Sequence, residues 1–121
     1  MITSFLQSLK TALESLDANR VVSHYSDDVV FTDPAAGDEW AITGKEELRK
    51  YFQRLFSLPE AKFEIASIFE SNGWGAAEWI WSSSRPDDNK RYRTTGASIV
   101  ELRDGKITRE TLYYNSRSGP S

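Results

Sequence analysis

The sequence predicts an α+β fold in which N-terminal helices pack on a strongly curved, mostly antiparallel sheet. Three observations predict it. Apolar residues recur at helical spacing in the first half of the chain, alternating strand patterns fill the second half, and strong turn signals separate those strands. A curved sheet with helices on one side forms a cone, and the open mouth of a cone is a natural ligand pocket.

The N-terminal part is predicted to form two helices. Apolar residues at helical spacing over residues 2–16 make one stripe along the first helix. Asp17 is suited to cap a second, shorter helix that runs through Tyr25. The lone histidine, His24, is predicted to be a packed residue at the end of this second helix.

A short strand is predicted over residues 29–32, which are β-branched and aromatic. It ends at Asp33 and Pro34, because proline cannot donate to a strand ladder. Residues 35–42 are predicted to be a loop that carries Trp40.

A third helix and a run of strands complete the predicted fold. Thr43 and Glu46 form a capping box, and the apolar residues that follow keep helical spacing through Phe56. The remaining strands are predicted over residues 63–69, 74–83, 91–102 and 107–114. Asn-Gly and Asp-Gly pairs at residues 72–73 and 104–105 predict two of the tight turns between them.

The composition excludes several classes of function. The 121 residues carry a net charge of −3, from 15 basic and 18 acidic side chains, so no basic excess points to nucleic acid or to an anionic membrane. The chain has no cysteine and one histidine, which excludes disulfides, thiol catalysis and a zinc site of four Cys or His ligands. A magnesium site made of carboxylates alone is compatible with this composition, but no acidic cluster indicates one, so we expect no metal and no cofactor.

The expected organisation is one domain over residues 1–115 and a flexible tail over residues 116–121. No apolar run approaches the roughly 18 residues that a membrane span needs. The N-terminus lacks a basic region followed by an apolar stretch, so no signal peptide is predicted and the expected location is cytoplasmic.

Three motifs, in order along the chain, carry a family resemblance. Residues 25–34 read YSDDVVFTDP, residues 44–48 read GKEEL and residues 104–109 read DGKITR. Together they resemble the ketosteroid isomerase and polyketide cyclase (SnoaL-like) branch of the NTF2-like superfamily, whose fold is an α+β cone. The resemblance implies the fold more firmly than the activity, because one fold carries many functions.

The resemblance to ketosteroid isomerases implies that Asp33 is the general base that moves a proton alpha to a ketone. In that family a tyrosine and a protonated aspartate form the oxyanion hole, and the matching positions here are Leu9 and Ser98. A supporting tyrosine falls near Phe52, whereas Tyr25 keeps another. Loss of one oxyanion donor commonly lowers the rate by ~10²–10³-fold, so steroid isomerase activity is not expected.

Strand alternation predicts which side chains line the pocket. The expected wall is aromatic with a few polar groups, which is the usual composition of a small-molecule site. The expected ligand-binding residues are Trp79, Trp81, Tyr92, Thr94, Ser98 and Leu112 on the strands, together with Tyr25 and Phe52. Trp40 in the loop is expected to be either a lid over the mouth or a surface anchor.

The candidates for chemistry are Asp33, Glu110 and Tyr114. A carboxyl group in an apolar cavity has a raised pKa, so it can act as an acid or a base near neutral pH. The resemblance to polyketide cyclases implies that an acidic residue protonates a substrate carbonyl, and either Asp33 or Glu110 fits this role. Two structural interpretations stay open. Asp33 before Pro34 also fits a turn cap, and Glu110 faces solvent if the register differs by one residue.

Alternative functions stay open on this sequence. A cofactor-independent acid/base enzyme of isomerase, cyclase or hydratase type, acting on an oxygenated hydrophobic molecule, is favoured by the carboxylates and the aromatic wall. A non-catalytic ligand-binding or interaction module is favoured by the missing oxyanion donors. A site like that of limonene epoxide hydrolase needs an Asp-Arg-Asp set, and no inward arginine is predicted.

The outer face of the predicted sheet carries Ile80, Ala97 and Ile99. Exposed apolar side chains on a sheet indicate a partner, and the resemblance implies dimers formed through this face. We therefore expect a homodimer, with a small hydrophobic molecule as the other partner.

Overall fold

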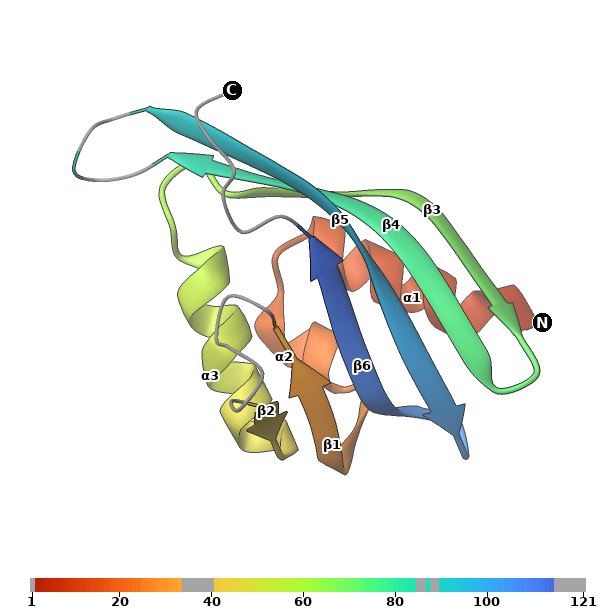
Figure 1. Ribbon diagram of the computed structural model, residues 1–121. Helices are drawn as coiled ribbons and strands as arrows, with labels where there is room; N and C mark the ends of the chain where they lie inside the picture. The colour runs from red at the N-terminus through yellow and green to blue at the C-terminus, as the bar shows by residue number, and fades with distance from the viewer. Residues whose placement is uncertain (1, 34–40, 85–86, 88–89, 115–121) are drawn as a thin grey trace.

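The computed structural model describes residues 2–33, 41–84, 87 and 90–114 (Figure 1). Trp40, Pro34 and the predicted tail over 116–121 lie outside the described residues. In chain order the elements are α1 (Ile2–Glu14), α2 (Ala18–Val22), β1 (Tyr25–Thr32), β2 (Ala41–Thr43), α3 (Lys45–Phe56), β3 (Lys62–Ser71), β4 (Trp74–Ser84), β5 (Arg91–Arg103) and β6 (Lys106–Tyr114).

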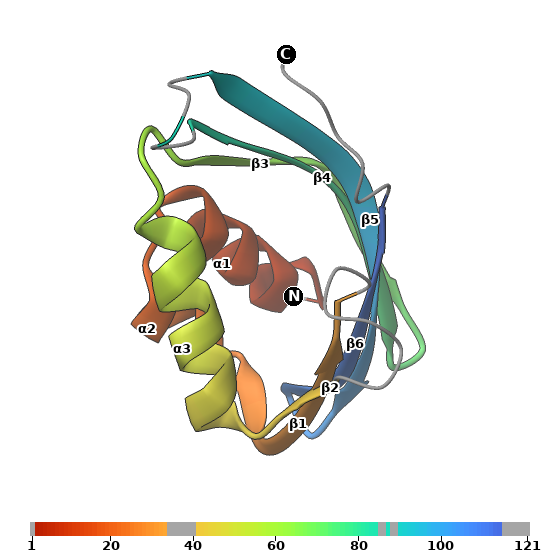
Figure 2. The ribbon, with the colours of Figure 1, turned by 60° about the vertical axis from the view of Figure 1, so that its left-hand side comes forward.

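The strands form one sheet in the order β2-β1-β6-β5-β4-β3. Only the β1–β6 pair among these strands is parallel, and the other neighbours are antiparallel. Figure 2 shows the sheet curling around α1 and α3, with its two edges apart. Helix α1 packs against β3, while α3 packs against β1 and β2. The predicted α+β cone with a strongly curved, mostly antiparallel sheet is confirmed.

The curvature of the sheet coincides with irregularities in strand pairing. The β3–β4 register shifts between Ile65 and Ser67, and the β1–β6 register shifts between Tyr25 and Val30. An extra residue in one strand bends that strand and increases its twist. At the β3 shift the carboxylate of Glu14 accepts the Ile65 N–H at 3.0 Å, which ties the end of α1 to the bend.

The two predicted tight turns are present. Asn72 and Gly73 have φ angles of 52° and 82°, and Asp104 and Gly105 have φ angles of 53° and 75°. Positive φ at both central residues is the geometry that favours Asn-Gly and Asp-Gly pairs between antiparallel strands. These local signals therefore connect β3 to β4 and β5 to β6 as predicted.

The predicted second helix is too long. Asp17 caps it as expected, with its carboxylate accepting the Arg20 N–H at 3.1 Å, but α2 ends at Val22. Tyr25 is instead the first residue of β1 and pairs with Ile107 of β6. The Ile107 N–H donates to the His24 carbonyl at 2.9 Å, so pairing with a distant strand overrides the local helical pattern.

The predicted capping box at the start of the third helix is wrong. Thr43 is the last residue of β2, a short strand inside the predicted loop, and it pairs with Val30. The N-cap of α3 is Gly44, which makes no side-chain cap hydrogen bond and has a φ of 94°. Its N–H donates to the Val29 carbonyl at 2.8 Å, which holds the chain in the sheet up to this residue.

The lone histidine packs between the helices, as predicted. His24 is buried, with Nε2 lying 3.0 Å from the Ser8 hydroxyl and Nδ1 lying 2.8 Å from the Arg20 carbonyl oxygen. Its ring also meets the Phe5 ring edge-on, at a centroid distance of 5.2 Å. These contacts give His24 a structural role at the junction of α1 and α2.

Candidate active site

A cavity of about 350 Å³ lies between the concave face of the sheet and the helices. That volume falls at the small end of the range for ligand pockets. The predicted site residues that line it are Asp33, Glu110, Tyr114, Trp79, Trp81, Tyr25, Phe52, Thr94, Ser98 and Leu112. The structure therefore brings together residues from both helical and sheet segments around one space.

Tyr92 does not line this cavity, unlike its neighbours on β5. It pairs with Ser83, close to the end of β4 and the start of β5. Figure 1 shows this end of β4 and β5 extending past the helices that cover the rest of the sheet. The expected role of Trp40 as a lid or anchor falls outside the described residues.

Glu110 is a buried carboxyl group in the wall of the cavity. Its Oε1 accepts a hydrogen bond from the Tyr25 hydroxyl at 2.6 Å. Burial raises the pKa of Glu110 from 4.5 to about 6, and hydrogen bonds from Tyr25 and Ser98 oppose that rise. Glu110 therefore faces the cavity rather than solvent, with a pKa close to neutrality.

The Tyr25 hydroxyl stays protonated beside this carboxyl group. Burial, and then the charge of Glu110, raise the pKa of Tyr25 well above its usual value of 10.0. A protonated phenol can donate its hydrogen bond to the carboxylate at any physiological pH. Tyr25 thus holds Glu110 in one orientation at the cavity wall.

Trp79 extends this network of contacts along the sheet to β4. Its Nε1–H donates to the Ser98 hydroxyl at 2.9 Å, and its ring meets the Tyr114 ring at a centroid distance of 5.5 Å. The indole lies directly over Gly96, where an added Cβ would stand 2.7 Å from the ring and from Tyr114 Cβ. Only glycine leaves room for the indole at this position of β5.

Asp33 forms a second polar cluster in the same wall. Its Oδ2 accepts the Tyr51 hydroxyl at 2.7 Å, and its Oδ1 accepts the Tyr114 hydroxyl. An ionised carboxylate can accept at both oxygens. Burial, and then the charge of Asp33, raise the pKa of Tyr51 far above its usual value. Asp33 is thus oriented by hydrogen bonds from two phenols.

Sheet register explains why both carboxyl groups face the cavity. Glu110 pairs with Phe31, whose ring lines the cavity, across the parallel β1–β6 ladder. Asp33 lies two residues after Phe31, and side chains two apart in an extended chain share a face. Asp33, which follows the last residue of β1, therefore faces the same cavity as Glu110 of β6.

Tyr51 was not predicted to be a site residue. It belongs to the apolar stripe of α3, and its spacing there indicated only core packing. The signal that distinguishes it is the hydroxyl group, because a buried tyrosine hydroxyl usually requires a hydrogen-bond partner. Its ring packs on Phe31 at 5.0 Å, which directs the hydroxyl to the end of β1.

The two positions that correspond to oxyanion donors lie in the wall without the expected donors. Leu9 presents an aliphatic side chain to the cavity, and the Ser98 hydroxyl is bonded to Trp79. Phe52, at the position of the supporting tyrosine, packs on Phe31 and Tyr51. A tyrosine-aspartate oxyanion hole of the isomerase type is therefore not built from these three residues.

Two further properties concern the described residues alone. They contain no group of three or more His, Cys, Asp or Glu side chains placed to hold a metal ion. Within the same ranges, no helix has the length and apolar character needed to cross a membrane.

Comparison with known proteins agrees with this architecture. The family model described as a SnoaL-like domain matches residues 6–110. No curated protein matches the sequence. Among solved structures, a protein of ketosteroid isomerase-like fold from Catenulispora acidiphila, in complex with trimethylamine, aligns at a TM-score of 0.81 and 16% identity, over 95% of this chain and 88% of the other.

Two more structures extend the comparison. An NTF2-like protein of unknown function from Burkholderia xenovorans aligns at a TM-score of 0.72 and 23% identity, over 99% of this chain and 87% of the other. A protein from Pseudomonas putida, provisionally described as a polyketide cyclase, aligns at a TM-score of 0.77 and 18% identity, over 94% and 91%. Identities this low bear on the fold alone.

Proposed function

This chain belongs to the SnoaL-like domain family, and from that premise we propose that it is a cofactor-independent acid/base enzyme of isomerase, cyclase or hydratase type. Its substrate is a small, hydrophobic, oxygenated molecule held in the cavity between sheet and helices. The resemblance of the sequence motifs to those of polyketide cyclases favours a carbonyl-containing substrate.

One observation carries the proposal: Glu110 is buried in the cavity wall with a pKa of about 6. A carboxyl group with that pKa is mostly ionised at neutral pH, yet it is a stronger base than an ordinary carboxylate. The Tyr25 hydroxyl at 2.6 Å fixes its orientation. Glu110 is thereby suited to take a proton from a carbon next to a carbonyl group.

The proton transfer has a defined balance. Glu110 accepts the proton from the α carbon, and the electron pair of the broken C–H bond forms the enolate. Tyr114 turns its hydroxyl from Asp33 to the enolate oxygen, while Tyr51 continues to donate to Asp33. Return of the proton from Glu110 to another carbon of the delocalised enolate completes an isomerisation. In a cyclisation the enolate carbon attacks a second carbonyl group, and Glu110 returns its proton to the alkoxide that forms.

Asp33 is the alternative proton acceptor, because the family resemblance gives the base this position. In the structure its two oxygens each accept a tyrosine hydroxyl, which favours a role in orienting Tyr51 and Tyr114. Substitution separates the two assignments. An orienting Asp33 changes the rate less than the base does and leaves the pH profile of Glu110 in place.

A second function, ligand binding without chemistry, is favoured by the same network. Tyr25, Trp79, Tyr51 and Tyr114 all use their polar hydrogens within the protein. A hydrogen-bond network satisfied within the protein makes the cavity rigid. A rigid cavity suits ligand binding as much as it suits catalysis.

Tryptophan fluorescence against a panel of steroids, polyketide fragments and terpenoid epoxides tests occupancy of the cavity, because Trp79 and Trp81 line it. We expect one compound class to change the emission, and Asp33→Asn to alter that response. Compounds that bind are then assayed for turnover. Binding without turnover supports the binding module. Unchanged emission with every compound class contradicts an accessible cavity.

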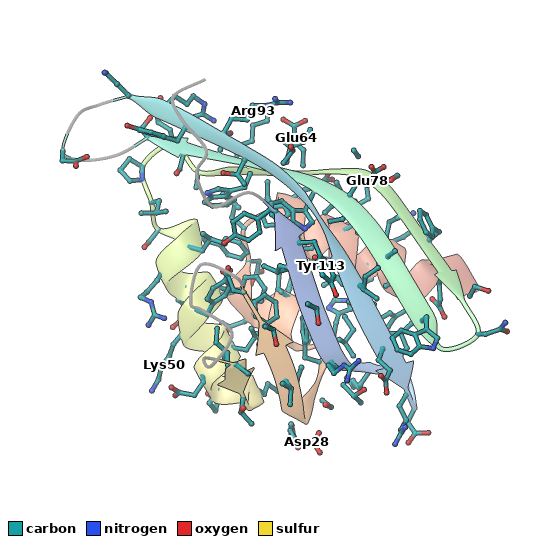
Figure 3. All side chains as sticks on the ribbon, viewed as in Figure 1. Asp28, Lys50, Glu64, Glu78, Arg93 and Tyr113 are labelled. Carbon is teal, nitrogen blue, oxygen red and sulfur yellow. The ribbon has the colours of Figure 1, made fainter. Side chains whose placement is uncertain are left out.

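We also propose that the outer face of the sheet forms a homodimer. Ile99 is 40% exposed and Phe69 is 62% exposed. Both residues pair with Ala76, Phe69 from β3 and Ile99 from β5. Directly paired residues share a face of the sheet. Tyr113, also exposed, pairs with Ala97, and Figure 3 shows it over β6, away from the helices. These residues place several exposed apolar side chains on one face of the sheet, as at many interfaces.

Sedimentation at micromolar concentration tests the dimer. We expect a particle of two 13.7 kDa chains, and we expect Ile99→Lys to give one chain. Leu58→Lys is the control, because Leu58 is similarly exposed but lies just after α3. A wild-type particle of one chain contradicts the proposal.

A further inference from the structure

Among the described residues, the cavity wall includes acidic ionisable side chains but no basic ones. Its described lining residues include the carboxyl groups of Asp33 and Glu110 but no lysine, arginine or histidine. Glu110 receives its hydrogen bonds from neutral donors, Tyr25 and Ser98. No ion pair involving Glu110 occurs in the described part of the chain. A mostly ionised Glu110 therefore brings negative charge into an otherwise apolar space.

Aromatic rings form part of the same cavity wall. Trp79 packs on Phe63 at 6.1 Å and on Tyr114 at 5.5 Å, and Trp81 packs on Phe63 at 5.6 Å. All four rings line the cavity. The face of an aromatic ring carries the negative part of its quadrupole, so it attracts a cation. The ring faces and the carboxylates thus both attract a positively charged ligand.

The tyrosine hydroxyls reinforce this bias. Tyr25 and Tyr51 point their hydrogens at Glu110 and Asp33, so these positive ends are directed at the carboxyl groups. Two basic side chains, Lys50 and Arg54, line a neighbouring hollow that shares Asp33, Tyr51 and Leu55 with the cavity. They are not among the residues that line the cavity itself.

We propose that the ligand of this cavity is a small hydrophobic molecule that carries a protonated or quaternary amine. This inference rests on the proposed function, because it names the substrate class for the same site. A cation gains attraction from Glu110 and from the rings, and this attraction offsets the loss of its hydration. A neutral molecule of equal shape gains only apolar contact, and an anion is repelled.

Three probes of matched shape test the charge preference: choline, its neutral isostere 3,3-dimethylbutan-1-ol, and the anion 3,3-dimethylbutanoate. Each is titrated into the protein with calorimetry and tryptophan emission as readouts. We expect choline to bind at least about tenfold more tightly than the alcohol, and the anion not to bind at millimolar concentration.

Two variants connect the preference to the cavity. Glu110→Gln is expected to bring the affinities for choline and the alcohol within about threefold of each other, while the affinity for the alcohol stays unchanged. Glu78→Gln is the control. Glu78 is exposed on β4 and bonded to Ser67, so the preference is expected to persist.

The outcomes separate this inference from the proposed function. Equal or tighter binding of the alcohol overturns the amine preference and leaves the cavity enzyme standing. Selective binding of choline together with an absence of turnover for every amino ketone tried supports the amine preference and overturns the enzyme. Failure of all three probes to bind overturns the amine preference for this cavity.

Discussion

Replacing Glu110 by glutamine is expected to lower the turnover of a cavity substrate by about 10²–10⁴-fold, the usual contribution of a positioned proton acceptor. Glutamine keeps the size of the side chain, and its amide oxygen can still accept the Tyr25 hydroxyl. The loss then comes from the missing base and not from a changed shape. Steady-state kinetics on a substrate identified with the fluorescence panel measure it.

The pH profile provides a second test of the same assignment. A base must be unprotonated, so kcat/KM of the wild type is expected to rise with pH and to level off above about 6, the pKa of Glu110. This rise of kcat/KM with pH is expected to be absent from Glu110→Gln and present in Asp33→Asn. The reverse pattern assigns the base to Asp33.

Stability measurements show whether Glu110→Gln is folded. The pKa of Glu110 is raised from 4.5 to about 6 by folding, so the unfolded chain releases the proton first as pH rises. As pH rises from 4.5 to about 6, the unfolding free energy of the wild type therefore falls by about 2 kcal/mol. Below pH 4.5, Glu110 is protonated in both the folded and the unfolded chain and causes no loss. Urea denaturation of Glu110→Gln is expected to lack this loss. A variant less stable than the wild type at pH 7 contradicts the buried-charge assignment.

Truncating Trp79 to alanine is expected to lower the unfolding free energy by about 3–5 kcal/mol, as for other large buried aromatic residues. The residue is 7% exposed, donates to Ser98, and packs on Phe63 and Tyr114. Its loss leaves a void against Gly96, which has no side chain to fill it. Urea denaturation measures the change.

Trp74→Ala is the matched control for Trp79→Ala. Trp74 is the first residue of the same strand, but it is 47% exposed, so its truncation is expected to change stability by about 0.5 kcal/mol. Trp79→Phe separates ring packing from the indole hydrogen bond and is expected to lose less than Trp79→Ala. Equal losses for Trp74→Ala and Trp79→Ala contradict the central position of Trp79.

Much of the architecture follows from local patterns. The helical stripe before Phe56, the strand alternation after residue 62, and the Asn72-Gly73 and Asp104-Gly105 turns all occur where they were predicted. Each depends on residues only a few positions apart. The errors occur where a distant strand competes with a local signal, as at Tyr25 and Thr43.

Strand alternation also predicted which side of the sheet carries the site. Trp79, Thr94 and Glu110 face the cavity because residues two apart share a face. Alternation does not say how far along a strand the helices extend, so Tyr92 was predicted to line a cavity that ends before it.

The sequence by itself therefore determined the fold class, the order of the elements apart from β2, and the inward face of the long strands. Only the tertiary structure decided which polar groups meet. Tyr25 and Glu110 are 85 residues apart, Tyr114 and Asp33 are 81 apart, and Tyr51 and Asp33 are 18 apart. The physical reason is that periodicity and turn propensity act over a few residues, whereas these hydrogen bonds form only after the curled sheet and α3 enclose the cavity.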